Sequence, residues 1–257
     1  MKGSAIPLQA KALEFPCLHF FMINWYIIAK AIIEKNKDQI LDEIKRFGPS
    51  GKEYPGDYDS EVEKSIIFSP LYDFLRRDKF VSEYSWAVPS EKSINYMKQF
   101  IGGELALELG SGNGLWAKLL KDSGLNIIPT DPAIWSLDST YNPNKEDKYI
   151  EVEKINHIQA IEKYHDANIL IFIWPSYDEN YAAEAVELFS GNKIIYIGEG
   201  KNGCTANDRF HELLDDEWRL VYSDGCEVNK NESNKSYEID RWTAIYDKIF
   251  FYIRIKK

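Results

Sequence analysis

The chain has 257 residues, of which 44% are hydrophobic, 28% charged and 14% aromatic, a composition that fits a globular protein and excludes a disordered acidic tail. Its 31 basic and 41 acidic side chains give a net charge of −10, which argues against tight, sequence-independent binding to nucleic acid. The length allows one α/β domain with an extension, or two small domains.

The apolar pattern of residues 1–80 predicts a helical extension, and this segment carries no recognisable motif. Residues 20–47 place apolar side chains at helical spacing, residues 48–60 form a turn-rich loop, and residues 62–75 resume the helical pattern. The apolar run at 15–29 is shorter than the roughly 18 residues that a membrane span needs, and it contains polar residues. We therefore expect no membrane anchor and no secretion signal.

Residues 81–257 predict an α/β domain. Ser90 is expected to begin a helix that runs to Ile101, and from residue 104 short apolar runs alternate with helical stretches, which is typical of βαβ units. The predicted strands are 105–109, 126–130, 148–152, 169–174, 194–198, 220–223 and 248–255, and the predicted helices between them are 115–122, 181–189 and 206–215. The last strand has no helix after it, so the expected fold is Rossmann-like, with a seven-stranded, mostly parallel sheet and an antiparallel terminal strand.

The three cysteines, Cys17, Cys204 and Cys226, stand at no metal-binding or disulfide spacing. Reduced thiols in a cytoplasmic compartment and no metal site are therefore expected. Cys204 has no base partner that the sequence reveals, so it is not expected to act as a nucleophile.

A glycine-rich turn separates the first predicted strand from the helix that follows. Its sequence is Glu108-Leu109-Gly110-Ser111-Gly112-Asn113-Gly114. Glycines let a ligand approach the main chain closely, and the turn lies at the carboxyl end of its strand, where open α/β sheets bind ligands. The dinucleotide pattern G-x-G-x-x-G is not met, because Leu115 stands where the third glycine would be. A tight strand–helix turn without a ligand would explain the same residues.

The spacing of Glu108, Gly110, Gly112 and Gly114 resembles the first motif of the class I S-adenosylmethionine-dependent methyltransferases, E/D-x-G-x-G-x-G. This resemblance implies that the loop wraps the methionine part of the cofactor and that Glu108 helps to hold its ammonium group. Asp131, at the end of the second predicted strand, would then bind both ribose hydroxyls. A carboxylate suits that role, because it accepts charge-assisted hydrogen bonds from a vicinal diol.

The resemblance assigns two further residues to the cofactor, Asn156 and Trp174. Asn156 follows the third predicted strand and would read the adenine edge, although a polar turn also explains it. Trp174 opens the segment Trp174-Pro175-Ser176-Tyr177, which is similar to the (D/N)-P-P-(Y/F) motif of amino-group methyltransferases. The tryptophan removes that motif's hydrogen-bonding group, which argues against nitrogen methylation by that mechanism. Tyr177 remains as a catalytic wall of the substrate pocket, or as a core aromatic residue.

The loop after the fifth predicted strand is rich in glycine and in acid–base groups. Glu199 lies between two glycines and is predicted to accept a proton or to orient the substrate. Asp208 and His211 share a face of the next helix and are assigned to the substrate pocket with Tyr84 and Trp86. Asp208 also fits a first-turn helix acid, and His211 a packed helix residue.

The stretch from about residue 80 to residue 257 resembles a group of methyltransferase-like proteins of unknown substrate. The segments that carry the likeness are YSWAVP, ELGSGNGLW, WPSY, YIGEGKNGCTANDRFH and RWTAIYDK. The implied function is S-adenosylmethionine-dependent methyl transfer to an unidentified small molecule or protein, with alignment in a dry aromatic pocket as the main source of catalysis. The alternatives are a methyltransferase-fold binding module without turnover and a nicotinamide-dependent oxidoreductase, which Leu115 disfavours. The oligomeric state is left open.

Overall fold

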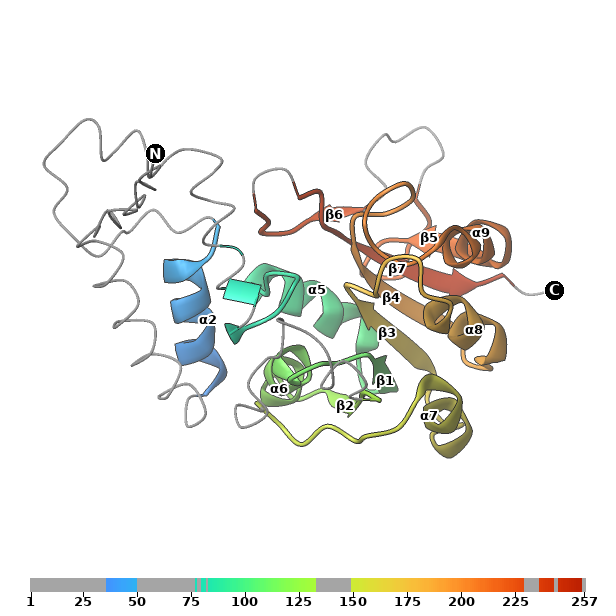
Figure 1. The fold of residues 1–257 in the computed structure, drawn as a ribbon, viewed down its shortest axis with the longest axis horizontal. Helices are drawn as coiled ribbons and strands as arrows, with labels where there is room; N and C mark the ends of the chain where they lie inside the picture. The colour runs from blue at the N-terminus through green and yellow to red at the C-terminus, as the bar shows by residue number, and fades with distance from the viewer. Residues whose placement is uncertain are drawn as a thin grey trace, which may run out of the picture.

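The computed structural model describes residues 36–49, 77, 80–81, 83–132, 149–228, 236–242 and 245–255 (Figure 1). The predicted helical stretches at 20–35 and 62–75, and most of the loop at 48–60, lie outside these residues. Within the described part of the chain, no helix is long and apolar enough to cross a membrane.

Helix α2 (Lys37–Phe47) confirms the second half of the predicted helical stretch at 20–47. It begins after Asn36, whose side chain accepts the backbone N–H of Gln39 while the Gln39 side chain accepts that of Asn36. Ile40 and Ile44 of α2 are buried in the same apolar cluster as the helices that cover one face of the sheet. This part of the N-terminal extension therefore packs against the α/β domain.

A mixed sheet forms the centre of the domain, in the strand order β2-β1-β3-β4-β7-β5, with the short β6 paired to β7. The strands are β1 (Leu105–Leu109), β2 (Asn126–Thr130), β3 (Ile169–Ile173), β4 (Lys193–Gly198), β5 (Trp218–Val221), β6 (Tyr237–Glu238) and β7 (Lys248–Arg254). Strands β1 to β4 run parallel, and β7 is antiparallel to the strands it pairs with, which are β4, β5 and β6. The predicted antiparallel terminal strand is confirmed, and it lies inside the sheet.

Helices cover both faces of the sheet, which gives three layers (Figure 1). These helices are α5 (Glu91–Ile101), α6 (Leu115–Asp122), α7 (His157–Lys163), α8 (Tyr181–Leu188) and α9 (Asp208–Glu217). The central strands alternate between two buried clusters: Ile169 and Ile171 pack with α5 and α6, whereas Leu170 and Phe172 pack with α7, α8 and α9. Strands buried on both faces explain the continuous apolar runs that predicted a parallel sheet.

The predicted strand at 148–152 was wrong for the residues that the structure describes there. Its only bridge to the sheet pairs Glu153 with Thr130. Pro129 lies on the outer edge of β2 and has no N–H to donate, so a regular ladder cannot continue there. The apolar pattern has another cause, because Ile150 and Val152 pack over the glycine turn at Gly114. A regular seventh strand is therefore not confirmed at this position.

Helix α7 is absent from the sequence-based prediction, and its start changes the interpretation of one residue. Asn156 is the N-cap of α7: its side chain accepts the backbone N–H of Gln159 at 2.9 Å, and Gln159 returns the bond. This capping box, N-x-x-Q, is a signal that the sequence contained. The hydrogen bond to Gln159 explains Asn156 without a ligand, and its adenine contact stays a prediction.

Candidate functional site

The turn between β1 and α6 leaves no room for a side chain at Gly114 and little room for one at Gly110. Gly110, Gly112 and Gly114 have φ values of +73°, +57° and +80°, in the left-handed region that favours glycine. A Cβ at Gly114 would lie 2.6 Å from Cγ2 of Ile150, and one at Gly110 would lie 3.1 Å from the Tyr181 hydroxyl oxygen. The turn thus presents bare main chain at the carboxyl end of β1.

Asp131 ties this turn to the end of β2. It is 3% exposed, and its Oδ2 accepts the backbone N–H of Gly112 at 3.0 Å. The backbone N–H of Gly110 also bonds to the Thr130 carbonyl, at 2.9 Å. The structure therefore brings together Asp131 and the glycine turn, which follow two different strands in the sequence.

Glu108 is a second buried acid beside this pair. The side chain is 1% exposed, and its Oε2 has no hydrogen-bond partner among the described residues. Burial, and secondly the negative charge of Asp131, raise the pKa of the Glu108 carboxyl to about 8. Two adjacent buried carboxyl groups favour a positively charged group as their partner.

A second group of side chains gathers where β3 ends and β7 begins. The indole Nε1 of Trp174 donates to Oδ1 of Asp247 at 2.7 Å, and the Trp174 ring stacks on Trp86 with the ring centres 5.0 Å apart. Trp174 has a φ of +53°, which is strained for a tryptophan. A strained backbone persists only where the surrounding structure holds it in place, and such positions cluster at functional sites.

The loops after β3 and β4 are bound to each other at this edge of the sheet. The backbone N–H of Asp178 donates to the Ala206 carbonyl at 3.1 Å, and that of Ala206 donates to the Pro175 carbonyl at 3.0 Å. Among the described residues, all non-glycine residues with a positive φ lie in these two loops: Trp174, Asp178, Asn202 and Ala206. Backbone strain is thus confined to the edge where ligands bind in open α/β sheets.

Asp247 was not among the predicted site residues. It is fully buried, it precedes β7, and its Oδ2 has no hydrogen-bond partner within the described part of the chain. Burial is the main cause that raises the pKa of its carboxyl to about 7, against the Trp174 hydrogen bond, which lowers it. The sequence signals were its place in the segment RWTAIYDK, which carries the family likeness, and its place directly before an apolar strand, and neither gave a reason to expect burial.

Both carboxylate oxygens of Glu199 are engaged by the main chain. Oε2 accepts the N–H of Cys204 at 2.7 Å, and Oε1 accepts the N–H of Tyr246 at 3.0 Å. Glu199 therefore links the loop after β4 to the segment that leads into β7. Its catalytic role stays a prediction, and the contacts favour a structural role.

Replacing Glu199 with glutamine should lower the free energy of unfolding by about 1–2 kcal/mol, because the new amide NH₂ would face a backbone N–H that now has a carboxylate acceptor. Thermal unfolding measures this change. The matched control is Glu212→Gln on α9, whose exposed side chain should leave the melting temperature unchanged. A Glu199→Gln protein that melts like the wild type, with methyl transfer reduced about 10²–10⁴-fold, would restore the catalytic role.

The other predicted pocket residues are dispersed. Tyr84 is fully buried in the core, where it stacks on Phe80, and its carbonyl accepts a hydrogen bond from Asn113 Nδ2 of the glycine turn at 2.7 Å. Tyr177 is 67% exposed and Trp86 is 38% exposed at the strand ends. These two exposed rings agree in position with a substrate surface, whereas the Tyr84 ring does not reach one.

Asp208 and His211 lie on α9, below the loop that Glu199 holds. His211 is buried and its Nε2 lies 3.2 Å from the Thr205 carbonyl, and burial lowers the pKa of its imidazole. Asp208 is exposed in the first turn of α9. Their contacts are those of a packed histidine and a helix-start acid, and their substrate role stays a prediction.

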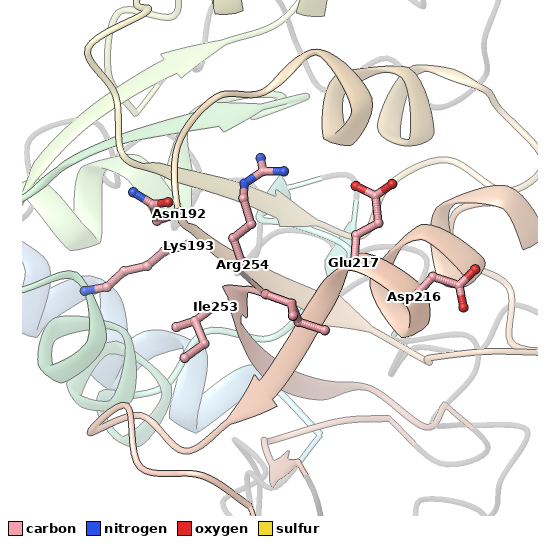
Figure 2. Close-up of a pocket in the computed structure, with 7 residues that line it drawn as sticks. Asn192, Lys193, Asp216, Glu217, Ile253 and Arg254 are labelled. Atoms are coloured by element: carbon pink, nitrogen blue, oxygen red, sulfur yellow. The ribbon is translucent and has the colours of Figure 1, made fainter. Parts of the chain in front are cut away.

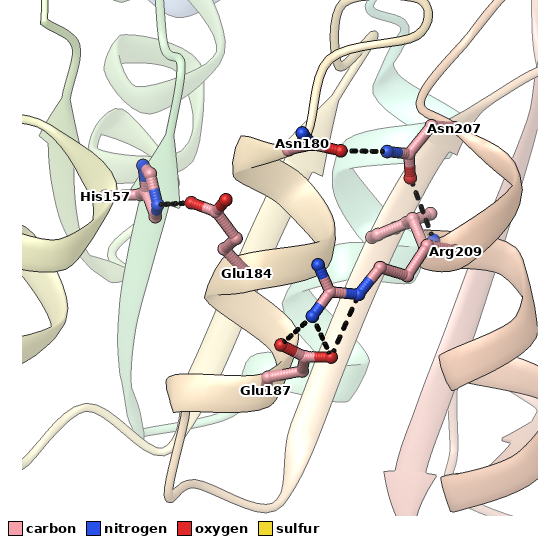
Figure 3. A network of polar contacts seen from close by, with 7 residues as sticks. His157, Asn180, Glu184, Glu187, Asn207 and Arg209 are labelled. Atoms are coloured by element: carbon pink, nitrogen blue, oxygen red, sulfur yellow. Dashed lines mark hydrogen bonds and ion pairs between the residues drawn. The ribbon is translucent and has the colours of Figure 1, made fainter.

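Polar contacts on the outer side of α7, α8 and α9 hold these helices together (Figure 3). His157 Nε2 lies 2.9 Å from Glu184 Oε2, and Asn207 Nδ2 donates to Asn180 Oδ1 at 3.0 Å. Because Asn180 and Asn207 begin α8 and α9, the second contact fixes the two loops that end at those helices.

The pocket in Figure 2 lies at the opposite edge of the sheet, where β4 begins and β7 ends. Its residues include Asn192, Lys193, Glu217 and Arg254. The Arg254 guanidinium donates to the carbonyls of Phe189 and Gly191 at 2.6 and 2.9 Å. This pocket is therefore separate from the glycine turn, and its arginine is already engaged by the main chain.

No protein-family model and no curated protein sequence matches this chain. Similar solved structures include magnesium protoporphyrin IX methyltransferase from Synechocystis PCC 6803 with bound S-adenosylmethionine, at 11% identity over 86% of this chain and 98% of that chain, with a TM-score of 0.41. Human N-acetylserotonin methyltransferase in complex with S-adenosylmethionine has 13% identity over 86% and 67%, with a TM-score of 0.39. The tRNA (m1A58) methyltransferase from Aquifex aeolicus has 12% identity over 70% and 76%, with a TM-score of 0.38. All three of these proteins are methyltransferases.

Proposed function

We propose that this chain binds S-adenosylmethionine at the carboxyl ends of β1 and β2 and transfers its methyl group to an acceptor bound beside β3 and β4. The observation that carries the proposal is the buried Glu108 carboxyl, whose Oε2 has no partner among the described residues and which lies next to a turn of bare main chain. The ammonium group of the cofactor supplies the positive charge that two buried acids favour.

The residues present fit the rest of the cofactor. In this proposal Asp131 accepts the ribose hydroxyls and keeps its bond to Gly112, because the two oxygens of a carboxylate can accept about four hydrogen bonds. The left-handed glycines allow the methionine part to lie against the main chain. When bound, the cofactor supplies a methyl group on a reactive sulfonium.

The chain's own contribution is to align the acceptor and to exclude water. The stacked indoles of Trp86 and Trp174 form an apolar wall beside the end of β3, and aromatic faces also attract a positive sulfonium. The net charge of −10 supports a small-molecule or protein acceptor over a nucleic acid.

Two observations favour the alternative of a binding module without turnover. Trp174 replaces the hydrogen-bonding residue of the amino-group motif, and both oxygens of Glu199 are engaged by the main chain. The proposed enzyme and the binding module both bind S-adenosylmethionine, but only the enzyme consumes it.

Incubation of the purified chain with cell extract and methyl-labelled S-adenosylmethionine separates the two. We expect S-adenosylhomocysteine to form together with a labelled product, and mass spectrometry detects both. Heat-inactivated protein is the control. Cofactor binding without either product would support the binding module, and no cofactor binding would contradict both.

A further inference from the structure

Asp247 is a buried acid that contacts the residue directly after β3. Lys248 pairs with Gly198 at the carboxyl end of β4, so Asp247 stands at the edge of the sheet that carries the glycine turn. Its Oδ1 accepts the indole N–H of Trp174, the residue that follows β3. A carboxylate from β7 is thus held at the strand end whose own sequence lacks an acid or amide.

The two oxygens of this carboxylate differ in their surroundings. Oδ1 has its bond from Trp174, whereas Oδ2 is buried and has no hydrogen-bond partner among the described residues. A buried acceptor without a partner is unfavourable, and a proton or a donor from a ligand relieves it. The Pro175 carbonyl, the main-chain acceptor of the same segment, already receives the Ala206 N–H. Oδ2 is therefore a buried acceptor at this strand end that has no hydrogen-bond partner among the described residues.

Burial is the main cause that raises the pKa of the Asp247 carboxyl, and the charged groups that face it modify that pKa. Glu199 raises it further, and Arg77 and Arg241 lower it. The Arg77 guanidinium carbon lies 5.1 Å from the Trp86 ring and 5.3 Å from the Trp174 ring, so it stands beside the stacked pair. The site thus combines an aromatic wall, a cation and a carboxylate that changes its charge near neutral pH.

We propose that Oδ2 of Asp247 accepts a hydrogen bond from an N–H nucleophile, so that the methyl acceptor is an amine held against the Trp86–Trp174 pair. This inference rests on the proposed function. The nitrogen lone pair forms the new N–C bond as the C–S bond breaks and its electron pair returns to sulfur. The nitrogen then gives up one proton, which Oδ2 accepts.

Access to Oδ2 requires a side chain to move, because Asp247 has no exposed surface in this conformation. Trp86 is the more exposed member of the stacked pair, at 38%. An aromatic amine would either displace the Trp86 ring or stack on it. An aromatic amine is therefore a suitable probe, and benzylamine carries both features, a ring and an N–H group.

The test is Asp247→Asn, which keeps the shape and can accept from Trp174 only through Oδ1. The amide NH₂ then occupies the place of Oδ2, so a donor replaces an acceptor. We expect the S-adenosylmethionine affinity to stay within about twofold of the wild type. Methyl transfer to benzylamine should fall roughly 10²-fold or more, the span for a positioned acid–base group. Asp240→Asn, an exposed change close by, should leave transfer unaltered.

Two readouts do not depend on turnover. Benzylamine should shift the NMR signal of the Trp174 indole N–H in the wild type and not in Asp247→Asn, whereas benzyl alcohol should shift it less. Asp247→Asn should also be more stable than the wild type at pH 8, and the difference should shrink as the pH falls below about 7 and vanish below about pH 4, where the carboxyl is protonated in both states. The sign follows because a carboxyl whose folded pKa is raised to about 7 costs stability as pH rises from its unfolded pKa through that value.

Trp174→Phe gives an independent check. It keeps the aromatic wall and removes the N–H that lowers the Asp247 pKa, so the pH profile of transfer should move to higher pH. If both proteins bind S-adenosylmethionine and benzylamine affects the wild type and Asp247→Asn equally, this inference is overturned and the proposed function is not. Failure of S-adenosylmethionine to bind would instead overturn the proposed function.

Discussion

Replacing Asp131 with alanine should weaken S-adenosylmethionine binding by about 2–4 kcal/mol, which is roughly 30- to 1,000-fold in Kd. Two charge-assisted hydrogen bonds to the ribose are lost, and the Gly112 N–H loses the acceptor that holds the turn, now at 3.0 Å. Calorimetric titration of the cofactor into the variant measures the change.

The matched control is Asp122→Ala, at the end of α6. Its side chain bonds to Lys118 on the helix surface at 2.5 Å, far from the strand ends, so the cofactor affinity should not change. Equal affinities for wild type and Asp131→Ala would remove Asp131 from the cofactor site.

Gly114→Ala should abolish measurable cofactor binding and reduce the free energy of unfolding by about 1–3 kcal/mol more than Gly102→Ala does. Both glycines have a positive φ, so both variants strain the backbone. Only at Gly114 would the new Cβ meet other atoms, at 2.6 Å from Ile150 Cγ2 and 2.9 Å from Val152 Cγ2, whereas Gly102 faces open space.

The pair therefore isolates close packing from backbone strain. Chemical denaturation and calorimetry on the two proteins supply the comparison. If Gly114→Ala binds the cofactor as Gly102→Ala does, the turn tolerates a side chain, and close packing against Ile150 and Val152 is not needed for the cofactor.

Features set by neighbours in the sequence were predicted correctly. Ser90 caps α5 through Ser93, α6 spans the predicted residues 115–122, and the apolar runs of β1 and β3 lie at the expected positions. Local hydrogen bonds and apolar spacing determine each of these. The pairing of Asp131 with the glycine turn also followed from topology, because parallel neighbouring strands end at the same edge.

Features set by distant residues could not be predicted. The apolar run at 150–152 packs on Gly114, which no local pattern distinguishes from a strand. Glu199 is bound by the Tyr246 N–H, and Asp247 by Trp174, across 47 and 73 positions of the chain. Such contacts determine whether both oxygens of a carboxylate are hydrogen-bonded or one is left without a partner. They form only when β7 pairs with β4.

The central claim is that the buried Glu108 carboxyl receives the ammonium group of S-adenosylmethionine. With a pKa of about 8, Glu108 is mostly protonated at pH 7, and a bound cation should ionise it. Titration calorimetry at pH 7 in two buffers of different ionisation enthalpy should therefore show close to one proton released per cofactor bound, and an affinity that rises with pH up to about 8. Glu108→Gln should bind more weakly and release no proton. Tight binding of the wild type without proton release, or no binding at all, would contradict the account.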